Sequence, residues 1–401
     1  MQVLWHLLFL RMNGDNMTSI IFTGDIGFDK YMDGKWEDED FLDEKVVDFL
    51  SEADHLCVNV EGPICPPIEK VGEDSVSRLL HSMNPEAVKF LDYIGADIWN
   101  LCNNHIMDAG CEGIENTLQL CRKHEAIALG AGMNIDEASK PVILDEAGGI
   151  GLIGVGYQRA CRKADENTAG CFSWSDLDLI KEKITQIKEK CRWCIIVSHA
   201  GEEFTSLPTP YTRERYLKYL EMGADIVIGH HPHVPMNYEL VDDKAIFYSL
   251  GNFVFDTDYQ RAQFYTERGV FVKLSFTETN YSFEAFGILI DRNRGKIVPY
   301  KLPDIFTPVD ENEYKKLVPL SAKAFLEATK RQLKYLYPDK FQNADENMFM
   351  ENFMEIPRSG RVPNETLDFH VIVPLAKSVS ESDIESSQLQ DVVKYIKSQM
   401  H

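Results

Sequence analysis

Side chains that bind metals and transfer protons occur in five short polar clusters of this chain, each directly after an apolar run. Carboxylate oxygens, amide oxygens and imidazole nitrogens are the ligands that divalent transition metals take in proteins. Because open α/β sheets bind ligands beyond the carboxyl ends of their strands, clusters that follow separate strands can meet at one point. The order of the clusters therefore predicts one metal-dependent hydrolase site. The clusters are T-G-D at Asp25, N-V-E-G-P at Glu61, N-N-H-I-M-D at His105, S-H-A-G-E-E at His199 and G-H-H-P-H at His231.

The cluster G-H-H-P-H carries the strongest indication of metal binding. Three imidazoles within four residues can present neighbouring nitrogens to one cation. His231 and His233 match a G-x-H-x-H presentation, whereas His230 can point back toward the sheet, and the spacing leaves open which of the three bind metal. His199 ends a strongly apolar run, where an imidazole without a ligand or a hydrogen-bond partner is costly. We therefore expect His199 to be a ligand as well.

The other clusters supply oxygen ligands and a proton donor. Asp25 and Glu61 are candidate metal ligands, although a carboxylate in such a loop can also cap the next turn. In N-N-H, the amide oxygen of Asn104 is a candidate ligand. His105, oriented by the carboxylate of Asp108, is the candidate catalytic proton donor, with a buried structural histidine as the alternative.

Strand-like and helix-like segments alternate between these clusters, and this alternation predicts a largely parallel, layered sheet. The segments I-G-A-D-I at 94–98 and M-G-A-D-I at 222–226 both indicate a helix, a glycine stop and a buried strand that ends at a histidine, which favours a shared site. We expect strands at 19–23, 55–60, 97–102, 151–155 and 194–198, and helices at 45–51, 85–94, 113–124 and 175–190.

The pattern changes after Asp256. Alternating residues predict antiparallel strands at 270–276, 283–290 and 296–301, which we expect to complete a second sheet packed on the first. Beyond them, 312–335 has helical spacing, 338–364 is polar, aromatic and irregular, and 381–400 is typical of an amphipathic helix. We therefore expect an N-terminal extension at 1–16, a main domain at 17–305 and a mostly helical accessory region at 306–401.

Composition excludes some partners. With 41 Lys+Arg against 64 Asp+Glu, the formal net charge of the 401 residues is -23, which disfavours nucleic acid and anionic membrane surfaces. A cation, or a substrate that carries one, suits this charge better. The apolar run at 3–10 has no basic residue before it and is too short to cross a bilayer, so we expect no membrane anchor.

The cysteines indicate a reducing, cytoplasmic location. The nine cysteines are scattered, and their odd number shows no paired disulfide framework. Only Cys191 and Cys194 have ligand-like C-x-x-C spacing, and no second pair follows them. We interpret them as ordinary buried cysteines, and metal binding or redox activity is the less favoured alternative.

The ordered motifs resemble those of the CapA-type family of bacterial capsule or poly-γ-glutamate synthesis proteins, which is similar to the calcineurin-like metallophosphoesterases. The resemblance extends from about residue 20 to 256 and implies an α/β fold, a four-layer αββα sandwich with a metal centre at the strand ends. It rests on T-G-D, N-V-E-G-P, L-C-N-N-H-I-M-D-A-G, H-A-G-E-E, G-A-D-I-V-I-G-H-H-P-H-V and I-F-Y-S-L-G-N-F-V-F-D.

Carried over by position, the resemblance assigns a role to each cluster. His105 corresponds to the catalytic histidine. Glu203, Asn252 and Asp256 match family positions and are expected to support the site or contact substrate, as are Asn59 and His230. The metal ligands implied are Asp25, Glu61, Asn104, His199, His231 and His233.

The first two motifs depart from those of ordinary phosphoesterases. Gly27 stands where a D-x-H motif has its histidine, and N-V-E-G-P replaces the usual G-D-x-x-D. A full dinuclear centre is therefore absent or rearranged.

We expect a hydrolase with one or two Mn, Fe or Zn ions, which would activate water and polarise the substrate. Its substrate would be a small molecule or an anionic polymer, cleaved at a phosphoester or related bond in capsule, poly-γ-glutamate or envelope-polymer metabolism. The alternative is a non-catalytic, metal-containing protein that binds polymer or assists its assembly. The sequence leaves the oligomeric state open.

Overall fold

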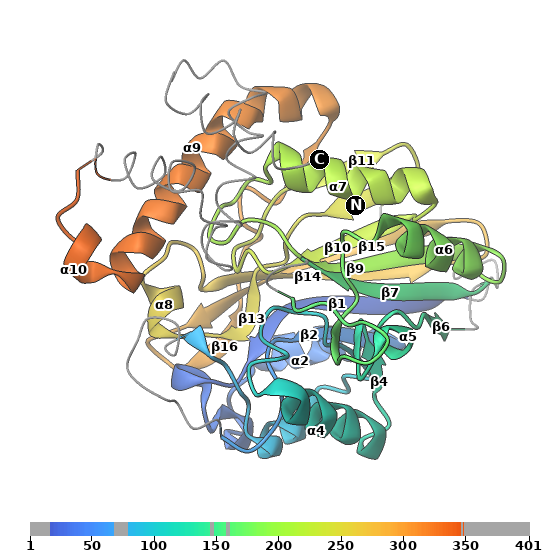
Figure 1. The fold of residues 1–401 in the computed structure, drawn as a ribbon, viewed down its shortest axis with the longest axis horizontal. Coiled ribbons are helices and arrows are strands. Elements are labelled where there is room, and N and C mark those ends of the chain that lie inside the picture. Colours follow the sequence, from blue (N-terminus) through green and yellow to red (C-terminus); the bar gives the residue numbers. More distant parts are fainter. Residues whose placement is uncertain (1–16, 68–78, 145–147, 158–160, 346–347, 349–401) are drawn as a thin grey trace.

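The computed structural model describes residues 17–67, 79–144, 148–157, 161–345 and 348. In this part of the chain two mixed β-sheets pack against each other, with helices on their outer sides (Figure 1). The expected α/β class is confirmed, and both sheets are mixed: parallel pairs predominate in the second sheet, whereas antiparallel strands form one side of the first. The N-terminal extension at 1–16 and the expected helix at 381–400 lie outside the described residues.

The first sheet is centred on β1, which delivers Asp25. The first half of β1 pairs antiparallel with β14, and its last residues pair parallel with β13, while β2 runs parallel along its other side. The sheet has the order β16-β15-β14-β1-β2-β3-β4, with β13 beside β1. Its strands are β1 (Thr18–Gly27), β2 (His55–Val60), β3 (Ile98–Asn100), β4 (Ile127–Leu129), β13 (Asn252–Phe255), β14 (Arg268–Phe276), β15 (Tyr281–Asp291) and β16 (Lys296–Pro299).

The prediction that the strands after residue 256 form the second sheet was wrong. β14, β15 and β16 extend the first sheet instead, because β14 pairs with residues 18–22 of β1. Alternating apolar residues show that a strand has a buried face, but they do not say which sheet edge it joins. That choice depends on the open edge that β1 presents.

The second sheet has the order β17-β11-β12-β10-β9-β7-β6, and its central strands β7, β9, β10 and β12 run parallel. A separate short ladder joins β5 and β8. The strands are β5 (Ala131–Gly132), β6 (Val142–Leu144), β7 (Ile150–Gly156), β8 (Gly170–Cys171), β9 (Trp193–His199), β10 (Ile226–His230), β11 (Tyr238–Val241), β12 (Lys244–Phe247) and β17 (Pro308–Val309).

Helices cover the outer side of each sheet, as Figure 1 shows. Apolar residues of α2, α3 and α4 pack on the first sheet, and those of α6 and α7 pack on the second. The helices are α2 (Glu44–Leu50), α3 (Val88–Tyr93), α4 (Gly110–Lys123), α5 (Ile135–Ala138), α6 (Leu177–Lys188), α7 (Pro210–Met222), α8 (Asp258–Arg261), α9 (Glu311–Leu336) and α10 (Pro338–Phe341), with short 3-10 turns at Lys30–Met32, Lys35–Glu37 and Pro85–Ala87.

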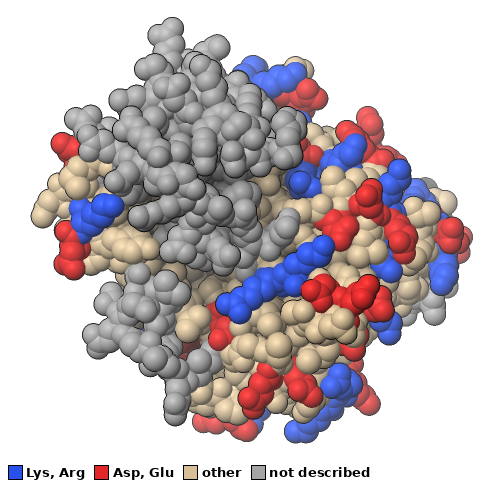
Figure 2. Space-filling model, in the orientation of Figure 1, with Lys and Arg blue, Asp and Glu red and all other residues tan. Residues whose placement is uncertain are grey.

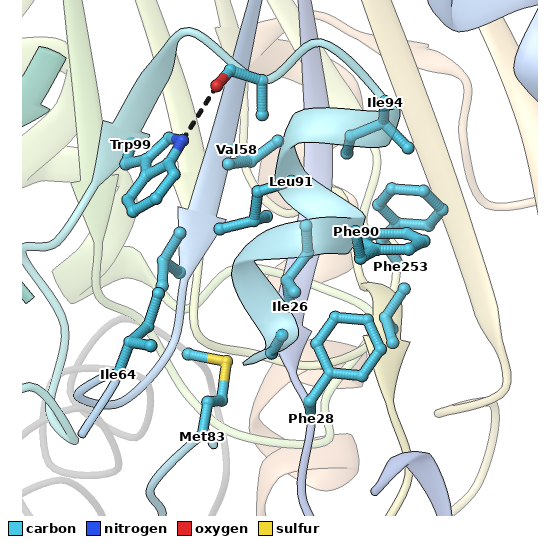
Figure 3. Close-up of a cluster of buried hydrophobic side chains, with 14 of the residues drawn as sticks. Ile26, Phe28, Val58, Ile64, Met83, Phe90, Leu91, Ile94, Trp99 and Phe253 are labelled. Atoms are coloured by element: carbon cyan, nitrogen blue, oxygen red, sulfur yellow. Dashed lines mark hydrogen bonds between the residues drawn. The ribbon is translucent and has the colours of Figure 1, made fainter. Parts of the chain in front are cut away.

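An aromatic core joins α3 to the first sheet near the site (Figure 3). The rings of Phe28 and Phe90 meet edge to face with centroids 4.9 Å apart, and Phe253 of β13 lies against Phe90. Trp99 is fully buried, and its indole N–H donates to the carbonyl oxygen of Ala96 at 2.9 Å. This packing fixes β1, β2 and β13 as a rigid platform.

A second core lies between the two sheets. Phe22 of β1 and Val197 of β9 are both fully buried there. Helices bury the outer sides of these strands as well. Both faces of each strand are therefore apolar, and each strand appears in the sequence as a continuous apolar run. Strands so enclosed hold their carboxyl ends in fixed positions.

The two similar I-G-A-D-I and M-G-A-D-I segments have the expected helix, glycine stop and buried strand, but only β10 ends at a histidine, His230, whereas β3 ends at Asn100, before His105. Gly95 and Gly223 follow α3 and α7 with φ of 72° and 117°, values that favour glycine at a helix end. The predicted helix at 312–335 is confirmed as α9. None of the helices within the described ranges combines the length and the apolar character needed to cross a membrane.

Figure 2 shows basic and acidic side chains interspersed over the described part of one face. The net negative charge is therefore not collected into a single acidic patch on that face. The division of the chain at residue 305 stays a prediction.

Candidate metal centre

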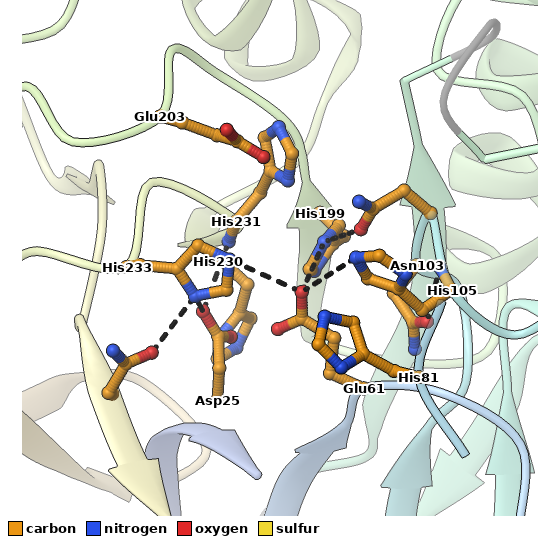
Figure 4. A network of polar contacts seen from close by, with 12 residues as sticks. Asp25, Glu61, His81, Asn103, His105, His199, Glu203, His230, His231 and His233 are labelled. Atoms are coloured by element: carbon orange, nitrogen blue, oxygen red, sulfur yellow. Dashed lines mark hydrogen bonds and ion pairs between the residues drawn. The ribbon is translucent and has the colours of Figure 1, made fainter. Parts of the chain in front are cut away.

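Strand register brings the predicted residues of both sheets together (Figure 4). Asp25 of β1 lies opposite Asn59 of β2 and Asn252 of β13. In the second sheet, His199 at the end of β9 lies opposite His230 at the end of β10. All five residues are buried. The strand ends therefore form one polar cluster inside the protein.

Asp25 is the most fully hydrogen-bonded carboxylate of this cluster. Its Oδ1 accepts from the Asn59 side-chain amide at 2.8 Å and lies 3.0 Å from Nδ1 of His230, and its Oδ2 accepts from the backbone N–H of His231 at 3.4 Å. Burial raises the pKa of Asp25, but hydrogen bonds from His230 and His233 outweigh burial and hold this pKa well below its usual value. Asp25 is thus an ionised carboxylate.

Glu61 is held quite differently. Both of its carboxylate oxygens are buried and accept no hydrogen bond from the described residues. Its Oε1 faces the Nε2 atoms of His233, His199 and His105 at 3.4, 3.8 and 4.0 Å. Burial raises the pKa of Glu61 to about 8. A buried carboxylate with no hydrogen bond is costly, and a cation among these groups would offset that cost.

Two groups of candidate donors lie close to the spacing that ligands of one ion have. Two ligands that each lie about 2.1 Å from one ion are at most about 4.2 Å apart. Two groups of three donors within 4.8 Å of one another occur among the described residues, namely Asp25 with Glu61 and His233, and Glu203 with His231 and His233. His233 belongs to both groups. The mixed imidazole and carboxylate donors suit Mn, Fe or Zn.

His233 is oriented by groups on its far nitrogen. Its Nδ1 lies 2.9 Å from the amide oxygen of Asn252 and 3.3 Å from Oδ2 of Asp25, so that Nε2 is directed at Glu61. Such a partner on the second nitrogen is usual for a metal-binding histidine. Burial lowers the pKa of His233, but Glu61 and Asp25 raise it to about 10. Without a metal, the protonated His233 ring is the cation beside the ionised Asp25 carboxylate.

The G-H-H-P-H turn has a strained backbone. His231 has φ of 96° and His233 has φ of 58°, in a region that residues other than glycine seldom occupy. The backbone N–H of Phe204 donates to the carbonyl oxygen of Pro232 at 2.9 Å and braces the turn. Strain of this kind is common at functional sites, and here it aims neighbouring imidazoles at different partners.

Asn104 and His199 meet as expected. The Asn104 amide oxygen lies 2.8 Å from Nε2 of His199, a distance that suits either a hydrogen bond or two adjacent ligands of one ion. The Asn59 amide lies 3.3 Å from Nδ1 of His199. Burial lowers the pKa of His199 well below its usual value, so its ring is neutral, the state that binds metal.

His105 and Asp108 form the predicted pair. Nδ1 of His105 lies 2.7 Å from Oδ2 of Asp108. Burial lowers the pKa of His105, but the Asp108 carboxylate outweighs burial and raises it. Asn103, which the sequence analysis left without a role, accepts from the backbone N–H groups of Gly62 and His105, both at 3.2 Å. It thereby ties the Glu61 loop to the His105 loop.

Sequence reasoning missed a second histidine–carboxylate pair beside the first. The rings of His81 and His105 meet edge to face with centroids 4.3 Å apart, and Nδ1 of His81 lies 2.8 Å from Oδ2 of Asp29. The His81 backbone N–H donates to Oδ2 of Asp108 at 2.8 Å. Burial lowers the pKa of His81 to about 4. No apolar run ends at His81, so only the tertiary structure reveals it.

The structure also explains the departure at Gly27. A Cβ atom at this position would overlap the ring of Phe255, its partner on β13. That ring is buried and stacks on His233 with centroids 5.0 Å apart. Phe255 thus fills the space in which a side chain at position 27 would lie, and the first motif offers no imidazole.

Glu203 and Asp256 differ in their surroundings. Glu203 faces His231 in Figure 4 and accepts hydrogen bonds from Tyr259 and from Gln332 of α9. Asp256 instead binds two guanidinium groups, with Oδ2 2.6 Å from Arg261 and Oδ1 3.0 Å from Arg292. The Asp256 carboxylate therefore anchors the chain after β13.

Comparison with known proteins gives a consistent match. Residues 19–257 match the family model described as bacterial capsule synthesis protein PGA_cap. The PGA biosynthesis protein CapA of Bacillus subtilis (strain 168) is 30% identical over 259 residues, which are 63% of this chain and 67% of that protein. The capsule biosynthesis protein CapA of Bacillus anthracis is 28% identical over 231 residues, or 56% of each chain. The chain thus spans about two thirds of the first relative and just over half of the second.

Solved structures share the general arrangement only distantly. A hypothetical protein from Thermus thermophilus aligns with a TM-score of 0.42 and 15% identity, over 67% of this chain and 98% of that one. A second protein from the same organism, TT1561, aligns with a TM-score of 0.36 and 10% identity.

Proposed function

Because this chain belongs to the bacterial capsule synthesis protein family PGA_cap, we propose that it is a metal-dependent hydrolase of capsule or poly-γ-glutamate metabolism. Its substrate would carry a phosphoester or a related acyl-type bond. The two relatives compared above are named for PGA biosynthesis and for capsule biosynthesis. The observation that carries the proposal is the buried Glu61 carboxylate, which accepts no hydrogen bond within the described part of the chain and faces three imidazoles.

The layer order of helices, two sheets and helices supports the metallophosphoesterase-like sandwich that the motifs imply. The residues that would hold one or two divalent ions are Asp25, Glu61, Asn104, His199, His231 and His233, with Glu203 beside them. A bound ion would supply a Lewis acid that activates water and polarises the substrate oxygen.

The contribution of the protein's own side chains would be a proton donor, His105, held in position by Asp108. The Asp108 carboxylate raises the pKa of His105 and so favours its protonated form, which could deliver a proton from Nε2 to a leaving group. Its Nε2 lies 4.0 Å from Glu61 Oε1, at the edge of the donor cluster. His105 is half-buried, whereas Asp25 and Glu61 are fully buried. His105 is therefore, like Asn104 and Glu203, a member of the cluster that the described residues do not fully enclose.

The purified protein tests this proposal directly. Elemental analysis should find Mn, Fe or Zn, and reconstitution with these ions should support hydrolysis within a panel of phosphomonoesters, phosphodiesters and γ-glutamyl peptides. Failure of the wild-type protein to bind any of these ions would overturn the proposal.

One observation favours a non-catalytic alternative. The Phe255 ring fills the space beside Gly27, so a ligand of ordinary phosphoesterases is missing. A protein that binds anionic polymer through a metal, without cleaving it, needs no aligned proton donor. Metal binding together with polymer binding and no turnover on the whole panel would establish this alternative.

A further inference from the structure

We propose that Gln332 of α9 is a positioning residue that holds the Glu203 carboxylate beside His231 and His233. Residues 19–257 match the family, and α9 lies outside them. This helix would then support the second group of metal donors, Glu203 with His231 and His233. This inference rests on the proposed function, because it concerns the metal that the site would bind.

Glu203 is held from two directions. The side-chain amide of Gln332 donates to Oε2 of Glu203 at 3.1 Å, and the hydroxyl of Tyr259 donates to the same oxygen at 3.3 Å. Gln332 and Tyr259 are both buried. Since both hydrogen bonds reach Oε2, Oε1 is left as the oxygen available to a cation.

The contact is part of a wider interface between α9 and the loop that carries Glu203. Ala328 and Leu336 of α9 form a buried cluster with Phe204 and Tyr259. Farther along the loop, the carbonyl oxygen of Pro208 accepts from Ser321 of α9 at 2.9 Å. The helix therefore fixes the loop by packing, and Gln332 adds the one hydrogen bond from α9 to the Glu203 carboxylate among the described contacts.

The inner side of the same loop is tied to the histidine turn. Phe204 donates from its backbone N–H to Pro232, and its ring stacks on that of His233 with centroids 5.8 Å apart. Glu203 thus lies between α9 and the imidazoles. A glutamate side chain is flexible, and a carboxylate restrained in advance loses less entropy when it binds an ion.

Removal of such an outer partner typically weakens metal binding by about 10- to 100-fold. The test is Co²⁺ titration of the full chain, followed by the visible absorption of the bound ion. Gln332→Leu, which keeps the apolar part of the side chain and removes its donor, should weaken Co²⁺ binding by at least about tenfold. Tyr259 lies outside α9, and Tyr259→Phe removes the second hydrogen-bond donor to Glu203. This variant should also weaken Co²⁺ binding.

Thr329→Val is the matched control, because Thr329 is a buried α9 residue whose hydroxyl donates to Phe325 of the same helix. It should leave the affinity and the spectrum unchanged. In a Glu203→Gln background, Gln332→Leu should cause no further loss, since its effect passes through the carboxylate.

Three outcomes would contradict the inference. An equal loss in the Glu203→Gln background would show that Gln332 acts only through general packing. Wild-type affinity in both Gln332→Leu and Tyr259→Phe would show that Glu203 needs no support. A wild-type protein that binds no Co²⁺, Mn²⁺ or Zn²⁺ would overturn the proposed function and this inference together, whereas the first two outcomes leave the proposed function intact.

Discussion

Asp25 and Glu61 are both fully buried carboxyl groups that contact His233, yet their surroundings favour different protonation states. Hydrogen bonds favour the ionised form of Asp25, whereas Glu61 accepts none from the residues that the structure describes, and burial raises the pKa of Glu61 to about 8. Such a contrast is a mark of functional sites. The surroundings favour an ionised Asp25, and a bound cation would favour the ionised form of Glu61 as well.

Substitutions of His105 and His231 should distinguish a role in proton transfer from a role in metal binding. His105→Ala should retain the metal and lower turnover by about 10²- to 10⁴-fold, the usual effect of removing a positioned proton donor. His231→Ala should lose metal and activity together, because it removes a nitrogen from the donor group. Elemental analysis and steady-state kinetics on the same preparations measure both effects.

The leaving group provides the control for this assignment. Esters of p-nitrophenol need little protonation on departure, so they should suffer less from His105→Ala than alkyl esters do. Equal losses for both ester types, or depletion of metal in the His105 variant, would place His105 among the metal ligands instead.

At the scale of elements, the close contact between β1 and β13 shapes the site. Gly27 and Phe255 are partners in the parallel register, and the Phe255 ring occupies the space beside Gly27. Gly27→Ala should lower the free energy of unfolding by about 1–3 kcal/mol, because an added methyl group overpacks a filled core. Urea denaturation of the metal-free protein measures this loss.

A double-mutant cycle tests the cause. In a Phe255→Leu background, where the smaller side chain leaves room, Gly27→Ala should cost clearly less than it does alone. An undiminished cost in this background would mean that the backbone at Gly27, and not the ring of Phe255, excludes a side chain.

At the scale of the whole molecule, every predicted site residue precedes residue 257, and Gln332 of α9 lies well before the last residues of the chain. Deleting the residues after Val379 should therefore leave the metal content of the folded protein unchanged. Elemental analysis of the truncated protein, compared with the full chain, is the measurement. Loss of metal from a soluble, folded truncation would show that the final segment completes the pocket.

Metal should also stabilise the molecule as a whole, because the donors come from both sheets. An ion present at about 100 times its Kd adds about 2.7 kcal/mol to the free energy of unfolding. The Tm of the wild-type protein should rise with Mn²⁺ or Zn²⁺ concentration and fall with a chelator. The Tm of His231→Ala should respond much less, and an equal response in both proteins would place the ion elsewhere.

The sequence alone predicted several strands that carry the site and the types of donor that follow them. Apolar runs followed by polar clusters located β1, β2, β9 and β10, because a strand enclosed on both sides must be apolar up to its end. Donor types limited the chemistry to metal binding and proton transfer, since few other roles need carboxylates, amides and imidazoles together. The helix ends at Gly95 and Gly223 were also predicted correctly, because helix ends leave a local signal.

Only the tertiary structure decided which donors meet. β14 joined the first sheet and not the second, because strand pairing depends on open edges that no local pattern encodes. His81 reached His105, and Gln332 reached Glu203, through contacts between residues distant in the chain. The orientation of the site side chains also depends on contacts between distant residues. His233 faces Glu61, and Asp256 binds two arginines. Residue types are local properties, but distances between side chains depend on the packing of the whole chain.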